Sequence, residues 1–181
     1  MTPRSTPFDA ARLSDVQREV LDEVRTGKRG TVPANVLAWL PSPELARRAA
    51  ALGEFVRYET SLPRRLSELA ILAVARQWAC EYEWAVHAVE AADAGVPGAV
   101  IASIARNEEP ILDLPDVHVY TFARALAAKG RVPDAVYTHA TALLGEQGVV
   151  DLIGVVGYYT LVAFTLNAGE VAAPAGSPRL G

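Results

Sequence analysis

Helix start and stop signals recur along the whole chain, and strand-like alternation of apolar and polar residues is nearly absent. Ser14 and Gln17 have the spacing of a capping box, and Gly27 follows that helix as a stop signal. Ser42-Pro43-Glu44 combines a capping side chain, a proline and a negative charge at the start of another helix. Gly95 stands where a left-handed residue ends helices. These start and stop signals predict an all-α fold.

The same signals predict where the helices lie and how the chain is organised. Residues 27–43 form a loop with at most one short helical turn, and residues 171–181, rich in Gly, Pro and Ala, form a flexible tail. Helices are predicted over residues 14–27, 42–58, 63–78, 80–94, a short stretch from 97, 115–128, 133–144 and 149–168.

Length and composition narrow the functional classes. The chain has 181 residues, enough for one domain with a sizeable core. Its net charge of −4 gives no electrostatic reason to bind nucleic acid or an anionic membrane. A single cysteine excludes an internal disulfide and suits a cytoplasmic location. The apolar run 152–168 is short and carries polar residues, so we expect a buried helix there and no membrane span.

A cluster of reactive side chains lies in the sequence "CEYEWAVH". Cys80, Glu83 and His87 are spaced by three and four residues, so they share one face if the helix already includes residue 80. A carboxylate one turn before an imidazole can hydrogen-bond it and raise its pKa, which makes an acid/base pair. The alternative is an ordinary surface pair, with Trp84 in the core.

Glu68 lies in the preceding helix, beside a long apolar stretch. It either faces solvent and pairs with Arg64 or Arg65, or it points at His87 across a contact between the two helices. In the second arrangement desolvation would raise its pKa and make it a proton donor.

The stretch "LPRRLSELAILAVARQWACEYEWAVHAVEAADAGVP", followed by the ending "GYYTLVAFTLNAGEV", resembles the carboxymuconolactone decarboxylase family, which includes the alkylhydroperoxidase D-like proteins. The resemblance implies an all-α, alkylhydroperoxidase D-like helical bundle that assembles as a homotrimer or homohexamer, with sites near subunit interfaces. It places the family core at residues 61–170, after packing helices in residues 1–60.

The motif on the second helix divides this family. The peroxidase branch carries C-x-x-C-x-x-x-H; Cys80 matches its first cysteine, His87 its histidine and Glu68 its upstream glutamate, while Tyr82 stands where a relay histidine can occur. Glu83 replaces the second, peroxide-attacking cysteine. The decarboxylase branch carries E-x-x-x-H, which Glu83 and His87 match, and it needs no thiol, metal or organic cofactor.

The resemblance therefore favours a decarboxylase-like enzyme that acts on a small carboxylated or lactone substrate. A general acid/base and a charge-stabilising group suffice for such a reaction. The hypothesis assigns these roles: His87 as proton shuttle, Glu83 to orient it, Glu68 as partner acid, Tyr82 as hydrogen-bond donor to the enolate, and Arg65 or Arg76 to hold the substrate carboxylate.

Three alternatives stay open. Cys80 could act alone as the thiol of a one-cysteine alkylhydroperoxidase, if its pKa is low. Cys80, Glu83 and His87 could bind zinc, with a further ligand from His118 or His139. The chain could also be a non-catalytic helical module that binds a small ligand in the same pocket.

Overall fold

The computed structural model describes residue 4 and residues 9–181, and this part of the chain contains helices and no strand. The all-α prediction is confirmed. A 3-10 turn, η1, precedes the helices. The elements are η1 (Ala10–Arg12), α1 (Asp15–Thr26), α2 (Ala34–Trp39), α3 (Pro43–Tyr58), α4 (Arg64–Gln77), α5 (Glu81–Asp93), α6 (Gly98–Ala105), α7 (Asp116–Lys129) and α8 (Asp134–Ala168).

The predicted caps explain several of these boundaries. Ser14 and Gln17 form both bonds of a capping box at the start of α1. At the end of α5, Gly95 has a φ of 90°, and the N–H of Val96 reaches the carbonyl of Ala91 at 2.9 Å. That is the long bond of a Schellman motif. Ser42 makes no side-chain capping bond, so Pro43 carries the start of α3.

One long helix, α8, covers the two predicted at residues 133–144 and 149–168. Gly145 has non-helical angles, φ 70° and ψ 175°, which kink the element where the prediction placed a break. Among the described helices α8 alone is long and apolar enough to span a membrane, by length and composition only. It packs against α2, α3, α4 and α7, and that packing buries one part of its apolar surface.

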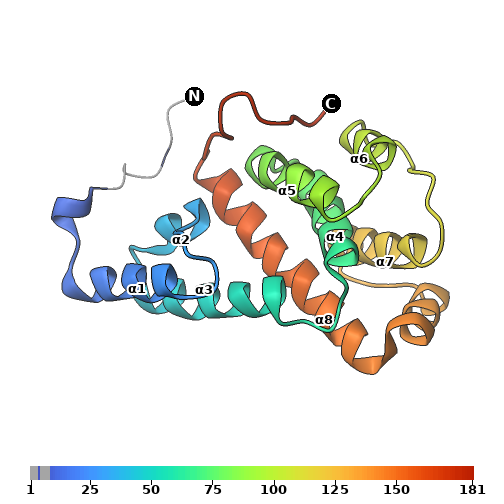
Figure 1. The fold of residues 1–181 in the computed structure, drawn as a ribbon, viewed down its shortest axis with the longest axis horizontal. Helices are drawn as coiled ribbons and strands as arrows, with labels where there is room; N and C mark the ends of the chain where they lie inside the picture. Colours follow the sequence, from blue (N-terminus) through green and yellow to red (C-terminus); the bar gives the residue numbers. More distant parts are fainter. Residues whose placement is uncertain (1–3, 5–8) are drawn as a thin grey trace.

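The core lies between α4, α7 and α8. Figure 1 shows α8 running diagonally across the molecule, with α1 to α3 on one side and α4 to α7 on the other. Leu69 and Leu72 of α4, Phe122 of α7 and Leu152 of α8 are all fully buried. Because α4 is buried along most of its length, its single buried carboxylate, Glu68, lies among apolar neighbours.

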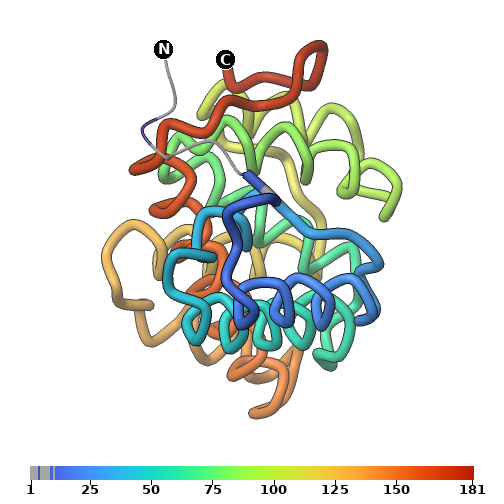
Figure 2. Tube along the Cα trace, turned by 90° about the vertical axis from the view of Figure 1, so that its left-hand side faces the viewer, coloured from blue at the N-terminus to red at the C-terminus, as the bar shows by residue number. Residues whose placement is uncertain are grey.

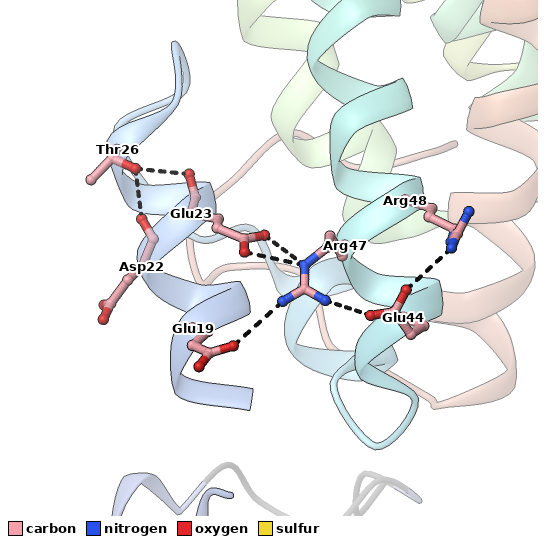
Figure 3. Close-up of polar contacts among 7 residues, drawn as sticks. All are labelled: Glu19, Asp22, Glu23, Thr26, Glu44, Arg47 and Arg48. Atoms are coloured by element: carbon pink, nitrogen blue, oxygen red, sulfur yellow. Dashed lines mark hydrogen bonds and ion pairs between the residues drawn. The ribbon is translucent and has the colours of Figure 1, made fainter. Parts of the chain in front are cut away.

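The first helices pack as a layer on α8. Figure 2 shows α1 beside α3 on the face turned to the viewer. Arg47 of α3 pairs with Glu19 and Glu23 of α1 and with Glu44 on its own helix (Figure 3). Exposed ion pairs contribute little to stability, so the burial of Val20 and Leu21 contributes more to the packing of α1.

Two close contacts join α3 and its following loop to α8. Asp151 of α8 accepts hydrogen bonds from the backbone N–H and the hydroxyl of Ser61, at 2.8 and 2.7 Å. Gly53 of α3 lies against the Tyr158 hydroxyl, so close that a Cβ at residue 53 would be 2.1 Å from that oxygen. Glycine is required here by space, not by backbone conformation.

The C-terminal residues, predicted to form a flexible tail, run back over α5 and α6. The N–H of Gly181 donates to the carbonyl of Ala105 at 3.1 Å. Arg179 lies 3.8 Å from Glu81, and Leu180 packs against the core. These contacts cover the outer side of α5 and leave its inner side facing α4 and α8.

Gly53→Ala tests the contact with Tyr158. The added Cβ must displace the tyrosine ring, and overpacking of this kind lowers the free energy of unfolding by about 1–3 kcal/mol. Urea unfolding followed by circular dichroism measures the change. The matched control is Gly98→Ala, where a Cβ meets nothing within 4 Å. It is expected to be neutral or stabilising by up to about 1 kcal/mol. Equal effects of the two variants would refute the steric argument.

Candidate active site

A tight turn between α4 and α5 sets the geometry of the site. Ala79 adopts a left-handed conformation, φ 46°, in the position where glycine usually ends a helix. The N–H of Cys80 bonds the carbonyl of Ala75 at 2.9 Å, and the N–H of Ala79 bonds that of Arg76 at 3.1 Å. This Schellman motif ends α4 and turns the chain directly into α5, so the two helices pack side by side.

That packing brings Glu68 and His87 together. His87 Nδ1 lies 2.7 Å from Glu68 Oε2, and both side chains are buried. The ring of His87 also meets the ring of Tyr159 edge-on, at 4.9 Å between centroids. The prediction that Glu68 points at His87 across the contact between the two helices is confirmed. The prediction that Glu83 orients His87 is wrong, because the orienting carboxylate belongs to the neighbouring helix.

Glu83 is a buried carboxyl group without a hydrogen-bond partner. Glu83 is 2% exposed, and neither of its carboxyl oxygens has a hydrogen-bond partner within the described part of the chain. Burial raises the pKa of Glu83 well above the usual carboxyl range, and the nearby Cys80 thiol offsets this only in part. The raised pKa favours the protonated form of Glu83, which can donate a proton.

A cavity of about 100 Å³ lies against these groups. Tyr82, Glu83 and His87 contribute to its wall from α5, which confirms that three of the predicted site residues face one space. Other polar groups come from elements to which the sequence analysis assigned no site residue. These are Arg29 and Asn35 before and within α2, Arg57 of α3, and Tyr158 and Tyr159 of α8.

Cys80 lies apart from this cavity, in the hydrophobic core. Its φ of −86° and ψ of 94° make it the N-cap of α5 rather than a helical residue. The expected common face of Cys80, Glu83 and His87 is therefore wrong for the thiol, which is 0% exposed. Burial raises the pKa of Cys80 to about 12, so it is a protonated thiol at neutral pH.

The arginines that line the cavity are not those proposed from the sequence. Arg65 pairs with Asp116, and the Nε of Arg76 is buried without a partner; neither residue lines the cavity. Arg57 does, and it pairs with Glu90 at 2.9 Å. Local sequence gives no signal for Arg29 or Arg57, because both reach the cavity from residues outside the α4–α5 motif.

The zinc alternative finds no support in the arrangement of side chains. In residue 4 and residues 9–181, no three His, Cys, Asp or Glu side chains are placed to hold one metal ion. His118 of α7 and His139 of α8, the suggested further ligands, stack on each other at 4.8 Å between ring centroids. The Nδ1 of His87 is already occupied by Glu68.

Comparison with known proteins gives matches to one family model and to solved structures. Residues 43–128 match the model of the carboxymuconolactone decarboxylase family. Among solved structures, a cysteine-to-alanine variant of the debrominase Bmp8 in complex with 2,3,4-tribromopyrrole has a TM-score of 0.70 at 13% identity. The alignment covers 96% of this chain and 91% of that one. Because the identity is low, the likeness concerns the fold. No curated protein matches the chain.

Glu83 makes a testable contribution to the pH dependence of stability. Because its pKa is raised in the folded state, the folded chain holds a proton that the unfolded chain releases above about pH 4.5. Its favourable contribution is therefore full at lower pH and is lost as pH rises toward the folded-state pKa. The loss is at most about 1.4 kcal/mol per pH unit.

Urea unfolding of the wild type and Glu83→Gln between pH 4.5 and 8 measures this slope. The amide cannot ionise, so the variant should gain stability relative to the wild type as pH rises. Glu146→Gln, at an exposed position of α8, is the matched control and should leave the profile unchanged. Parallel profiles for Glu83→Gln and the wild type would refute a protonated Glu83.

Proposed function

The chain is a member of the carboxymuconolactone decarboxylase-like family, and from this premise we propose that it is an enzyme with Glu/His acid-base chemistry. Its substrate would be a small carboxylated or lactone compound. The observation that carries the proposal is that His87, held by the buried Glu68, and the buried, unpaired Glu83 line one cavity. An imidazole and a carboxylic acid in one site supply a base and an acid at the same pH.

The pair fixes which nitrogen of His87 reacts. Glu68 occupies Nδ1, so this carboxylate holds a proton on Nδ1 and leaves Nε2 to exchange protons with the substrate or with water. Glu68 also stabilises the imidazolium that forms when Nε2 takes a proton. His87 is therefore the proton shuttle, as proposed from the sequence, and Glu68 becomes its positioning partner.

Decarboxylation of a β,γ-unsaturated or β-keto acid then needs two events. The bond between the α-carbon and the carboxylate breaks, CO2 leaves, and the electron pair is delocalised as an enolate for a β-keto acid or as an allylic carbanion for a β,γ-unsaturated acid. The carboxylic acid of Glu83 transfers its proton to carbon, and the imidazolium of His87 returns a proton to Glu83 through water in the cavity. The balance is one proton taken from solvent for each CO2 released.

The remaining polar groups of the wall fit the charge that develops. Tyr82 lines the cavity one residue before Glu83, and its hydroxyl can donate a hydrogen bond to the enolate oxygen. Arg57 adds positive charge to the same wall, and its ion pair with Glu90 neutralises part of that charge. Both groups favour an anionic intermediate over a neutral one.

The peroxidase alternative is less well supported. A one-cysteine peroxidase needs an accessible thiolate, whereas Cys80 is buried, outside the cavity wall and protonated. The solved relative is a debrominase, and its bound compound is a small ring. The chemistry proposed here rests on Glu83 and His87 instead of a thiol.

A screen of carboxylated lactones and β-keto acids for CO2 release tests the function. We expect turnover that falls by about 10²–10⁴-fold in His87→Ala, because proton transfer is lost. Glu68→Gln should lower kcat by a smaller factor, since Nε2 remains in place. Glu83→Gln should lower kcat because its amide donates no proton to carbon. Cys80→Ser should keep most of the wild-type rate.

Hydroperoxide consumption with a dithiol reductant is the counter-assay. Turnover that depends on Cys80 would contradict the proposal and make the chain a one-cysteine peroxidase. Compounds that bind and never react would make it a ligand-binding member of the family. An unchanged rate of CO2 release in His87→Ala would exclude the mechanism while keeping the activity.

We also propose that the chain forms a homo-oligomer through α8. Its outer face carries Val150, Ile153, Leu161 and Phe164, which are 65%, 43%, 38% and 49% exposed. With Gly157 these residues follow a spacing of three and four, which makes one apolar stripe on the helix. The stripe has no charge, so a second copy of the same stripe complements it. A trimer or hexamer is expected from the family resemblance.

Ile153→Arg tests this assembly. A charge in the centre of the stripe would be buried without a partner in the interface, so the variant should dissociate to monomers. Size-exclusion chromatography with light scattering measures the mass. Val89→Arg, at an exposed apolar position of α5, is the matched control and should keep the wild-type mass. A wild-type protein that is monomeric at micromolar concentration would refute the proposal.

A further inference from the structure

A second cavity lies beside the first and shares three residues of its wall. It has a volume of about 180 Å³ and lies between α1, α3 and the loop that connects α1 to α2. Arg29, Pro33 and Tyr158 line both cavities. The boundary between the two spaces therefore contains one cationic side chain, that of Arg29.

A hydrogen bond and an ion pair hold the loop that carries Arg29 against α3 and the residue after it. The backbone N–H of Lys28 donates to Glu54 Oε2 at 2.9 Å, and the Lys28 ammonium pairs with Glu59 at 2.9 Å. Gly27 lies so close to Glu54 that a Cβ there would be 2.4 Å from the carboxylate. Glu54 of α3 and Glu59, the residue after α3, thus fix the residues before Arg29 and set the place where its side chain enters the wall.

Among residue 4 and residues 9–181, Arg29 has no carboxylate partner. Its only hydrogen bond within the described residues is a long one, 3.5 Å, to the carbonyl of Gly53. The other cation of the inner cavity, Arg57, is paired with Glu90. Residues 1–8 contain no Asp or Glu, so the part of the chain without described positions supplies no carboxylate either. The guanidinium is free to bind an anion.

The charge of Arg29 acts inside the cavity. Burial raises the pKa of both Tyr158 and Tyr159, and the positive charge of Arg29 opposes that rise for both phenols. A carboxylate at the boundary would bind this charge in a partly desolvated place, where a fork of two N–H donors gives strong and directional bonds.

We propose that Arg29 anchors the carboxylate of the substrate at the boundary of the two cavities and selects anionic substrates over neutral ones of the same shape. This inference deepens the proposed function and rests on it. With the carboxylate on Arg29, the rest of the substrate lies in the inner cavity, against Glu83 and His87. Arg29 is a specificity-determining residue and takes no part in proton transfer.

The volume of the inner cavity indicates a short acid. A dry cavity of about 150 Å³ accommodates benzene, and this one measures about 100 Å³. An unsaturated acid of about four carbons is a suitable probe for that volume. Crotonate and its neutral isostere crotonamide differ only in the group that Arg29 would bind, so the pair isolates the contribution of the charge.

The test is a titration of the full-length protein with crotonate and with crotonamide, followed by NMR or calorimetry. Wild type should prefer crotonate, and Arg29→Gln should bind crotonate at least tenfold more weakly with crotonamide binding unchanged. Arg29→Lys, which keeps the charge and loses the fork, should lie between them. Arg25→Gln, at an exposed position of α1, is the matched control and should bind both compounds as wild type does.

Equal binding of crotonate and crotonamide by wild type, or undiminished crotonate binding by Arg29→Gln, would overturn the proposal. If Arg29→Gln does not fold, as judged by circular dichroism, the wild-type preference and Arg29→Lys decide the question. CO2 release with no carboxylate selectivity would refute the anchor and keep the proposed function. Selective crotonate binding without turnover of any acid in the screen would keep the anchor and refute the function.

Discussion

The buried contact between Glu68 and His87 is the constraint on which the site depends. A carboxylate and an imidazole lie 2.7 Å apart between α4 and α5, away from water, and each satisfies the other. Either group alone would be a costly buried polar side chain. The contact requires α4 and α5 to lie side by side in one register, and the Schellman motif at Ala79 and Cys80 supplies that register.

Three regions of the molecule line the cavity beside this contact. The inner side of α5 provides the acid, the imidazole and a phenol, while α8 closes the wall with Tyr158 and Tyr159. The N-terminal layer brings the positive charge through Arg29 and Arg57. The first sixty residues, expected only to cover the core, thus take part in the site.

Several features were predictable from the sequence, and their physical reason is local. Helices begin and end at caps formed by neighbouring residues, so the capping box at Ser14 and the stop at Gly95 were read correctly. Glu83 and His87 share a face because one helical turn separates them. The prediction for Cys80 is wrong because a one-residue shift in the start of α5 cannot be seen in spacing, yet it leaves the thiol in the core.

The sequence by itself determined an all-α chain, the two helices that carry the reactive groups, and which of those groups lie one turn apart. These properties depend on backbone capping and helical periodicity, which act over a few residues. The tertiary structure alone decided that Glu68 rather than Glu83 holds His87, that Glu83 is an unpaired acid, and that Arg29 rather than Arg65 meets the cavity. Partner choice and desolvation depend on packing between residues far apart in the chain, and no local pattern encodes them.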